Sequence, residues 1–304
     1  MAIVVFGTVA LDTVKTPFGE RQDVLGGSGT YASYSAGFFT EVGLVGIVGD
    51  DFSEEHLKML RQRHVDTTGV EVAPGKTFRW KGLYEYDMNE AKTIETQLNT
   101  LDKYMPKIPD TYRDYEYILL ANNDPDMQVH ALEQMHQPRL VICDTMNLWI
   151  DIKKSELKRL LGMVDVIILN DGEARQYTGQ PSLVKAASMI SAEGPKSVII
   201  KKGEHGALLY SDGRFFAVPG FPLEEIHDPT GAGDTFAGGF VGYLAKNGRL
   251  TQETLRRAVV YGSVMASFNV EKFSLERLIT LTEADIKNRY DDFVRLTHFE
   301  LPQP

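Results

Sequence analysis

The chain has 304 residues, a formal net charge of −10 and a pI near 5.3, and 43% of its residues are hydrophobic and 24% charged. This composition is typical of a globular enzyme with a sizeable core, and the acidic balance argues against a nucleic-acid binder, which normally carries a basic excess. An anionic nucleotide remains compatible with it, because a local positive pocket can lie in an acidic protein.

The N-terminal segment begins with an apolar stretch from Ile3 that no charged leader precedes, so we expect a first strand rather than a signal peptide. No apolar run approaches the ~20 residues of a transmembrane helix. The single cysteine, Cys143, can form no intrachain disulfide, and its apolar neighbours favour a buried strand residue. These features predict a cytoplasmic protein without membrane contact.

Short apolar runs recur along the chain and alternate with segments of helical spacing. The runs expected as buried strands are 3–9, 43–48, 117–120, 140–143, 164–169, 197–200 and 207–210. Helical patterning lies between several of them and dominates after residue 235. The alternation predicts an α/β fold, with a mostly parallel sheet between two layers of helices.

The segment 70–100 breaks this rhythm. Polar and apolar residues alternate there with the period of two that is expected of strands with one wet face, and no helical pattern intervenes. We expect a small β-sheet flap. Its aromatic residues could stack on a ligand, although packing of the flap or of a dimer is the commoner cause of such a stripe; they are Phe78, Trp80, Tyr84 and Tyr86.

The strongest chemical signal is the run Asp228–Asp234, which reads Asp-Pro-Thr-Gly-Ala-Gly-Asp and leads into a helix of small and apolar residues. Glycines expose backbone N–H groups, and the helix start adds unpaired donors and the positive end of its dipole, which together bind anions. Asp234 at the mouth of this turn could take a proton from a hydroxyl. The alternative is a helix N-cap after a glycine turn, where Asp is common.

The run resembles the C-terminal signature of the PfkB/ribokinase family of carbohydrate and nucleoside kinases, with Pro229 in place of the family's usual Thr. The resemblance implies that Asp234 is the catalytic base. It also implies a monovalent-cation site near Asp228 and Thr230, and whether potassium fills it stays open. The residues expected to cradle the transferred phosphoryl group are Gly231, Ala232 and Gly233.

The same resemblance implies a ribokinase-like three-layer α/β/α fold. One kinase domain would span 1–304, with a β-sheet lid built from the discontinuous segments 10–24 and 68–104. The exposed edges of such a sheet often pair between subunits, so a homodimer through the lid and a monomer both stay open.

The substrate side of the implied site lies near the N-terminus. Asp12 resembles the family aspartate that hydrogen-bonds substrate hydroxyls, and Gly26 and Gly27 resemble its di-glycine hinge. A polar strand cap and a plain glycine turn are the alternatives. Tyr31 follows where sugar kinases of the family often carry asparagine, which is a departure from the pattern. Asn122 follows a buried strand, as does Asn147, and the carboxyl ends of such strands border the ligand crevice of open α/β sheets.

The nucleotide side of the implied site lies in the middle of the chain. Asn170 and Glu173 resemble the family's Asn-x-x-Glu motif, in which the glutamate orders Mg²⁺ through water, and helix capping is the alternative. A second turn resembles the family's nucleotide-binding turn and equally fits a hairpin. The residues singled out in it are Lys201, Gly203 and Gly206.

Together these features predict an ATP- and Mg²⁺-dependent phosphotransferase acting on a hydroxyl of a small sugar or sugar-derived substrate. A nucleoside is the second choice, because Tyr31 and the aromatic flap could stack a base. A non-catalytic sugar or nucleotide sensor on the same fold is the third, although a sensor needs no catalytic base. A dinucleotide-dependent oxidoreductase is disfavoured, since the chain lacks a strand-anchored Gly-x-Gly-x-x-Gly.

Overall fold

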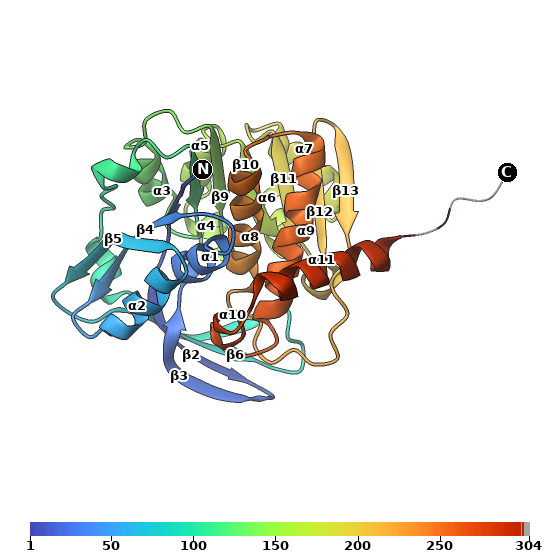
Figure 1. Ribbon diagram of the computed structural model, residues 1–304. Helices are drawn as coiled ribbons and strands as arrows, with labels where there is room; N and C mark the ends of the chain where they lie inside the picture. Colours follow the sequence, from blue (N-terminus) through green and yellow to red (C-terminus); the bar gives the residue numbers. More distant parts are fainter. Residues whose placement is uncertain (299, 301–304) are drawn as a thin grey trace.

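The computed structural model describes residues 1–298 and 300, and its centre is a nine-stranded sheet (Figure 1). Neighbouring strands run parallel except at one end, where β12 and β13 are antiparallel to their neighbours. In spatial order the strands are β13 (Arg214–Val218), β12 (Ala207–Ser211), β11 (Ser197–Lys201), β10 (Val166–Asn170), β9 (Leu140–Asp144), β8 (Tyr117–Leu120), β1 (Ile3–Phe6), β4 (Val42–Gly49) and β5 (Val65–Ala73). The expected mostly parallel sheet is therefore confirmed.

Both faces of this sheet are covered, as the continuous apolar runs predict. In β1 all four residues are fully buried; Ile3 and Val5 point into one core, and Val4 and Phe6 into the other. The helices of the first core are α1 (Ser28–Ala36), α2 (Glu54–Gln62), α8 (Ala232–Asn247), α9 (Gln252–Asn269), α10 (Glu276–Ile279) and α11 (Glu283–Thr297). Those of the second are α3 (Pro125–Leu132), α4 (Asn147–Ile152), α5 (Lys154–Leu161), α6 (Asp171–Thr178) and α7 (Leu183–Ser191). Short 3₁₀ turns lie at η1 (Asn99–Lys103), η2 (Asp110–Tyr112) and η3 (Gly203–His205).

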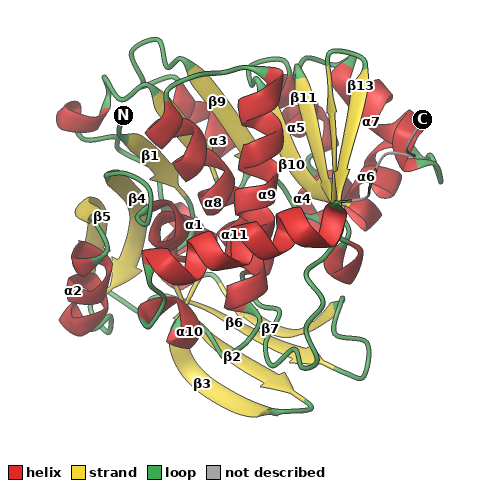
Figure 2. Ribbon diagram, turned by 45° about the vertical axis from the view of Figure 1, so that its right-hand side comes forward, coloured by secondary structure: helices red, strands yellow, loops and turns green. Residues whose placement is uncertain are grey.

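A second, four-stranded sheet lies below the helices of the first core in the view of Figure 2. We call it the lid. Its strands, in spatial order, are β3 (Gly19–Gly26), β2 (Ala10–Thr16), β6 (Phe78–Tyr84) and β7 (Ala91–Gln97). The range 68–104 expected for its second segment includes the end of β5, which pairs in parallel with β4 and so belongs to the large sheet.

The lid has one covered face and one open face. Val14 and Tyr84 pack against Phe273 of the body, with Trp80 and Met88 alongside. The strand β7 is exposed along nearly its whole length. The covered face therefore lies toward the body. Within the described residues, no helix has the length and apolar character needed to cross a bilayer.

Candidate active site

The signature run forms the turn into α8, and its glycine cap fixes the geometry. Gly231 is the N-cap residue with φ 73°, a left-handed conformation that favours glycine. A Cβ on Gly231 would also collide with the ring of Tyr31. The amide of Ala232 donates to the Pro229 carbonyl at 3.1 Å, whereas the amides of Gly231 and Gly233 have no acceptor in the described part of the chain. Free amides at a helix start make this turn suited to an anion.

Asp234 lies in the first turn of α8 and is only partly exposed. The pKa of its carboxyl is raised to about 7, first by burial and then by the charge of Asp144, while Lys201 opposes the shift. A carboxyl with a pKa near neutrality is suited to general base catalysis at physiological pH. The position and the pKa of Asp234 both fit the role of a base beside an anion site.

A second buried carboxyl, Asp12, projects from lid strand β2. Its side chain is 4% exposed, and burial raises its pKa to about 7 although the Gly27 amide opposes the shift. The charges of Asp228 and Asp234 contribute to the raised pKa of Asp12, so the three carboxylates interact electrostatically. A Cβ on Gly26 would collide with the Asp12 carboxylate, so this glycine lets β3 pass close to it.

Asp12 and Tyr31 each have one buried polar atom without a hydrogen-bond partner among the residues that the structure describes. These atoms are Oδ1 of Asp12 and the hydroxyl of Tyr31, whose pKa is raised by burial and then by Asp228 and Asp12. Buried polar atoms without partners are rare in folded proteins. A pair of them beside the turn into α8 fits a ligand that carries hydroxyl groups.

The turn is held from behind by residues at the end of α9. Asp228 accepts the Thr230 amide at 2.9 Å and the Ser274 amide at 3.0 Å. Asn269 donates to the Thr230 carbonyl at 2.8 Å and accepts from the Thr235 hydroxyl at 3.1 Å. These contacts fix the residues that the sequence assigned to a cation site. Within the described residues no cluster of three His, Cys, Asp or Glu side chains could hold a metal ion.

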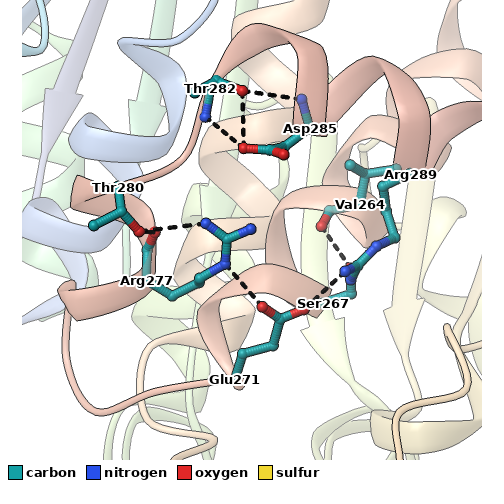
Figure 3. A network of polar contacts seen from close by, with 8 residues as sticks. All are labelled: Val264, Ser267, Glu271, Arg277, Thr280, Thr282, Asp285 and Arg289. Atoms are coloured by element: carbon teal, nitrogen blue, oxygen red, sulfur yellow. Dashed lines mark hydrogen bonds and ion pairs between the residues drawn. The ribbon is translucent and has the colours of Figure 1, made fainter.

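A network of charged residues fixes the end of α9 in turn (Figure 3). Glu271 accepts from Arg277 at 2.9 Å and from Arg289 at 2.8 Å, which joins α9 to α10 and α11. Arg289 also donates to the Ser267 hydroxyl at 3.0 Å. The adjacent carbonyl of Val270 accepts the amide of Asp228 at 3.3 Å. The support of the turn thus extends to the outer helices.

The profile of the family described as "pfkB family carbohydrate kinase" matches residues 4–280. This chain belongs to that family. It is 34% identical over 259 residues to the cytidine kinase of Thermococcus kodakarensis, covering 84% of this chain and 92% of the relative. It is 36% identical over 118 residues to the ribokinase of Haemophilus influenzae, covering 37% of each chain.

Several solved structures share the fold of this PfkB-family chain. The nucleoside kinase of Burkholderia thailandensis in complex with inosine gives a TM-score of 0.75 at 20% identity, covering 95% of this chain and 98% of that one. A putative ribokinase II from E. coli in complex with ATP and Mg²⁺ gives 0.75 at 18% identity, covering 95% and 99%. The ribokinase-like fold implied by the sequence is confirmed.

On the nucleotide side of this PfkB-family chain, Asn170 and Glu173 open α6. They form a capping box, in which Glu173 accepts the Asn170 amide at 2.6 Å and Asn170 accepts the Glu173 amide at 2.7 Å. Helix capping, the alternative role considered for Asn170 and Glu173, is therefore observed. Burial raises the pKa of Glu173 to about 7, Lys201 opposes the shift, and Asp144 and Asp234 add to it. Glu173 therefore caps a helix and also lies within the electrostatic reach of Asp234.

The second predicted turn joins the antiparallel strands β11 and β12 and contains η3. Gly203 has φ 52° and Gly206 φ 84°. A Cβ on Gly203 would collide with the side chain of Asn89, which lies in the loop between lid strands β6 and β7. The loop at one end of the lid therefore reaches the turn that the sequence assigned to the nucleotide.

Asn122 is held by its surroundings. Its side-chain oxygen accepts from the Trp149 indole at 3.1 Å, and its carbonyl accepts from the Ser28 hydroxyl at 2.9 Å. Asn147 is exposed at the start of α4. Asn122 thus joins α1 to α4, and its predicted contact with the substrate stays a prediction.

Sequence reasoning did not single out Asp144, the last residue of β9. It is 2% exposed and accepts from Lys201 Nζ at 2.9 Å, across the end of β10. The position of Asp144 at the carboxyl end of a buried strand was the signal that could have identified it. Asn269 was missed as well, and nothing in the sequence near it indicates its role.

Proposed function

We propose that this kinase transfers a phosphoryl group from ATP to a hydroxyl on the sugar moiety of a nucleoside. The observation that carries the proposal is the position of Asp234 in the first turn of α8, directly after free amides and a turn that packs on the ring of Tyr31. Asp234 also interacts electrostatically with Asp12, and Asp12 and Tyr31 carry the unsatisfied polar atoms. A base beside an anion site and a hydroxyl-binding site is what phosphoryl transfer to an alcohol requires.

The covered face of the lid supports a nucleoside rather than a free sugar. The ring of Trp80 lies over Gly82, where a Cβ would collide with it, and its indole N–H donates to the Thr93 hydroxyl at 3.1 Å. In the lid sheet Trp80 is paired in register with Asp12. A fixed aromatic ring beside a hydroxyl-binding carboxylate is suited to stacking a base. The names of the cytidine kinase and the inosine-bound nucleoside kinase lend further support.

In the proposed mechanism Asp12 and Tyr31 bind hydroxyls of the acceptor. Asp234 accepts the proton of the attacking hydroxyl, and the amides of Gly231 and Gly233, with the positive end of α8, stabilise negative charge on the phosphoryl group. The lid covers the acceptor and excludes water.

The residues present fit ATP and Mg²⁺. The free amides of the turn and the Lys201 ammonium suit phosphates, and Glu173 offers a buried carboxylate that interacts electrostatically with Lys201. Mg²⁺, when bound, neutralises phosphate charge and takes few protein ligands besides water. Potassium near Asp228 and Thr230, a dimer through the lid and a cytoplasmic location stay predictions.

A coupled assay of ADP release tests the proposal. Cytidine, uridine, inosine and adenosine are compared with ribose, fructose and a sugar acid, each with Mg-ATP, in sodium and in potassium buffer. We expect kcat/KM for at least one nucleoside to exceed that for every sugar by tenfold or more. The ribokinase similarity favours the second candidate, a sugar kinase, and turnover of ribose alone would support it. ATP binding without turnover of any acceptor would support the sensor.

A further inference from the structure

The sequence assigned Lys201 to a turn that could be a plain surface hairpin, but its side chain lies beside the proposed phosphoryl site. Lys201 ends β11, and its side chain is 18% exposed. Its ammonium lies 2.8 Å from the point where a Cβ on Gly233 would stand, so it contacts the turn into α8. The amide of Gly233 is one of those in this turn that have no acceptor among the described residues. The ammonium therefore lies beside a residue of the turn whose amide is free.

The ion pair with Asp144 holds the Lys201 ammonium in a fixed position. Asp144 accepts the Thr145 amide through Oδ1 at 2.7 Å and the Lys201 ammonium through Oδ2 at 2.9 Å, so both carboxylate oxygens are fixed. This bond takes one of the three ammonium donors, and the other two have no acceptor among the residues that the structure describes. Spare donors on a shielded cation can bind an anionic group.

The charges around Lys201 keep it protonated. Burial acts against the ammonium, but the carboxylates of Asp144, Glu173 and Asp234 outweigh it and raise the pKa of Lys201. The side chain therefore acts as a donor and a fixed positive charge, and it cannot serve as a base.

We propose that Lys201, oriented by Asp144, donates hydrogen bonds to the phosphoryl group during transfer and completes the anion hole formed by the Gly231 and Gly233 amides. This role rests on the proposed phosphoryl transfer and adds a catalytic residue, Lys201, and a positioning residue, Asp144. The acceptor oxygen bonds to phosphorus as the bond from phosphorus to the leaving diphosphate breaks. The hydroxyl proton passes to Asp234, and Lys201 keeps all its protons.

The variant Lys201→Met tests the role, because it preserves the length of the side chain and removes the charge. Loss of one preorganised donor at such a site typically costs about 10²–10³-fold in turnover. We expect kcat to fall by about this factor while the Kd for ADP rises less than about tenfold. The second readout is binding of ADP with aluminium fluoride, which mimics the phosphoryl group in flight. Its affinity should fall far more than the affinity for ADP alone.

Two further variants distinguish a catalytic role of Lys201 from a purely structural one. Lys196→Met removes an exposed lysine just before the same strand, paired with Asp165 at 3.1 Å, and should leave all three measurements unchanged. Asp144→Asn keeps the lysine but loosens its orientation, so kcat should fall about tenfold and the affinity for ADP should persist.

Thermal unfolding of each variant shows whether it is folded. If Lys201→Met does not fold, the proposal is tested with Asp144→Asn instead, by kcat and by the affinity for ADP with aluminium fluoride relative to that for ADP alone. A folded Lys201→Met protein with kcat within threefold of the wild type would overturn the proposal. So would an affinity for ADP that falls as much as that for ADP with aluminium fluoride. A wild-type protein that turns over no acceptor would instead refute the proposed function itself.

Discussion

Asp234 is the single side chain on which turnover depends most in the proposed mechanism, because it alone is assigned to accept the proton. Its carboxyl is shielded, and burial raises its pKa to about 7. Replacement by asparagine preserves the shape and removes the base. We expect Asp234→Asn to lower kcat by about 10²-fold or more while the Kd for ADP stays within threefold of the wild type. Turnover near that of the wild type would show that Asp234 is not the base.

The raised pKa of Asp234 predicts how the activity depends on pH. A base must be deprotonated to act, so activity should be lost as the pH falls through the pKa of Asp234 and should be constant above it. We expect kcat/KM to fall at least tenfold per pH unit below about pH 7, since Asp12 titrates in the same range. A pH profile of kcat/KM that is flat down to pH 5 would contradict the assignment of the raised pKa.

At the scale of the element, the turn into α8 depends on the end of α9. The side chain of Asn269 is 1% exposed and binds the Thr230 carbonyl and the Thr235 hydroxyl. Removing it leaves both groups buried without a partner, which costs about 1–3 kcal/mol each. We expect Asn269→Ala to lower the free energy of unfolding by at least about 1 kcal/mol and kcat by about tenfold.

Denaturant unfolding and steady-state kinetics measure these two effects. Asn247→Ala, at the exposed end of α8, serves as the control and should change neither quantity. A loss of stability without a loss of kcat would show that Asn269 supports the fold but not the turn.

The prediction about the acceptor concerns Trp80 of the lid, which we expect to stack on the base of a nucleoside. Trp80 lies over Gly82 on its covered face, in register with Asp12. Base stacking on an aromatic side chain is worth about 1–3 kcal/mol. We expect Trp80→Ala to raise KM for the preferred nucleoside by about 10–100-fold and to leave KM for ATP unchanged. Tyr86→Ala removes a fully exposed aromatic residue near the same strand and should have no effect. An unchanged KM for the nucleoside in Trp80→Ala would favour the sugar kinase.

Sequence patterns predicted the elements that depend on local information. The continuous apolar runs gave the buried strands, and the run ending at Asp234 marked the turn into α8, because both signals lie within a few consecutive residues. The pairing of Lys201 with Asp144 and that of Asn269 with Thr230 could not be predicted. Each joins segments far apart in the chain, and the contact depends on the strand order and helix packing that only the folded structure defines.

Local patterns also misplaced one boundary. The alternation that marked the flap begins near residue 70, inside β5. A strand at the edge of the large sheet has the same period of two as a lid strand, since each has one wet face. The partner strand, which the sequence does not indicate, decides which sheet such a segment joins.

At the scale of the whole molecule, the site lowers the stability of the ligand-free protein. The pKa of Asp12 is raised to about 7 in the folded state, above the 3.8 of an exposed aspartate. The folded state therefore binds more protons than the unfolded chain between these values, and the free energy of unfolding falls as the pH rises through this window. Below about pH 4 Asp12 does not lower the free energy of unfolding, and above about pH 7 it lowers it by the full amount.

Replacement of Asp12 by asparagine should remove this loss. We expect Asp12→Asn to unfold at least about 2 °C above the wild type at pH 8, with a smaller gain at pH 5, in calorimetry without ligands. Asp102→Asn, at an exposed position, should show no such difference between the two pH values. A lower unfolding temperature for Asp12→Asn at pH 8 would mean that the carboxylate is stabilised by contacts that asparagine cannot make.

The division of the site between two sheets has a consequence for how the family diversifies. Asp12 and Trp80 lie on lid strands β2 and β6, whereas Asp144, Glu173, Lys201 and Asp234 lie on or directly after elements of the large sheet and its helices. If the proposed site is right, mutations in the lid can change the acceptor without disturbing the residues assigned to phosphoryl transfer. Selection can act on these two parts at different rates, which is consistent with one fold whose members carry names as different as cytidine kinase and ribokinase.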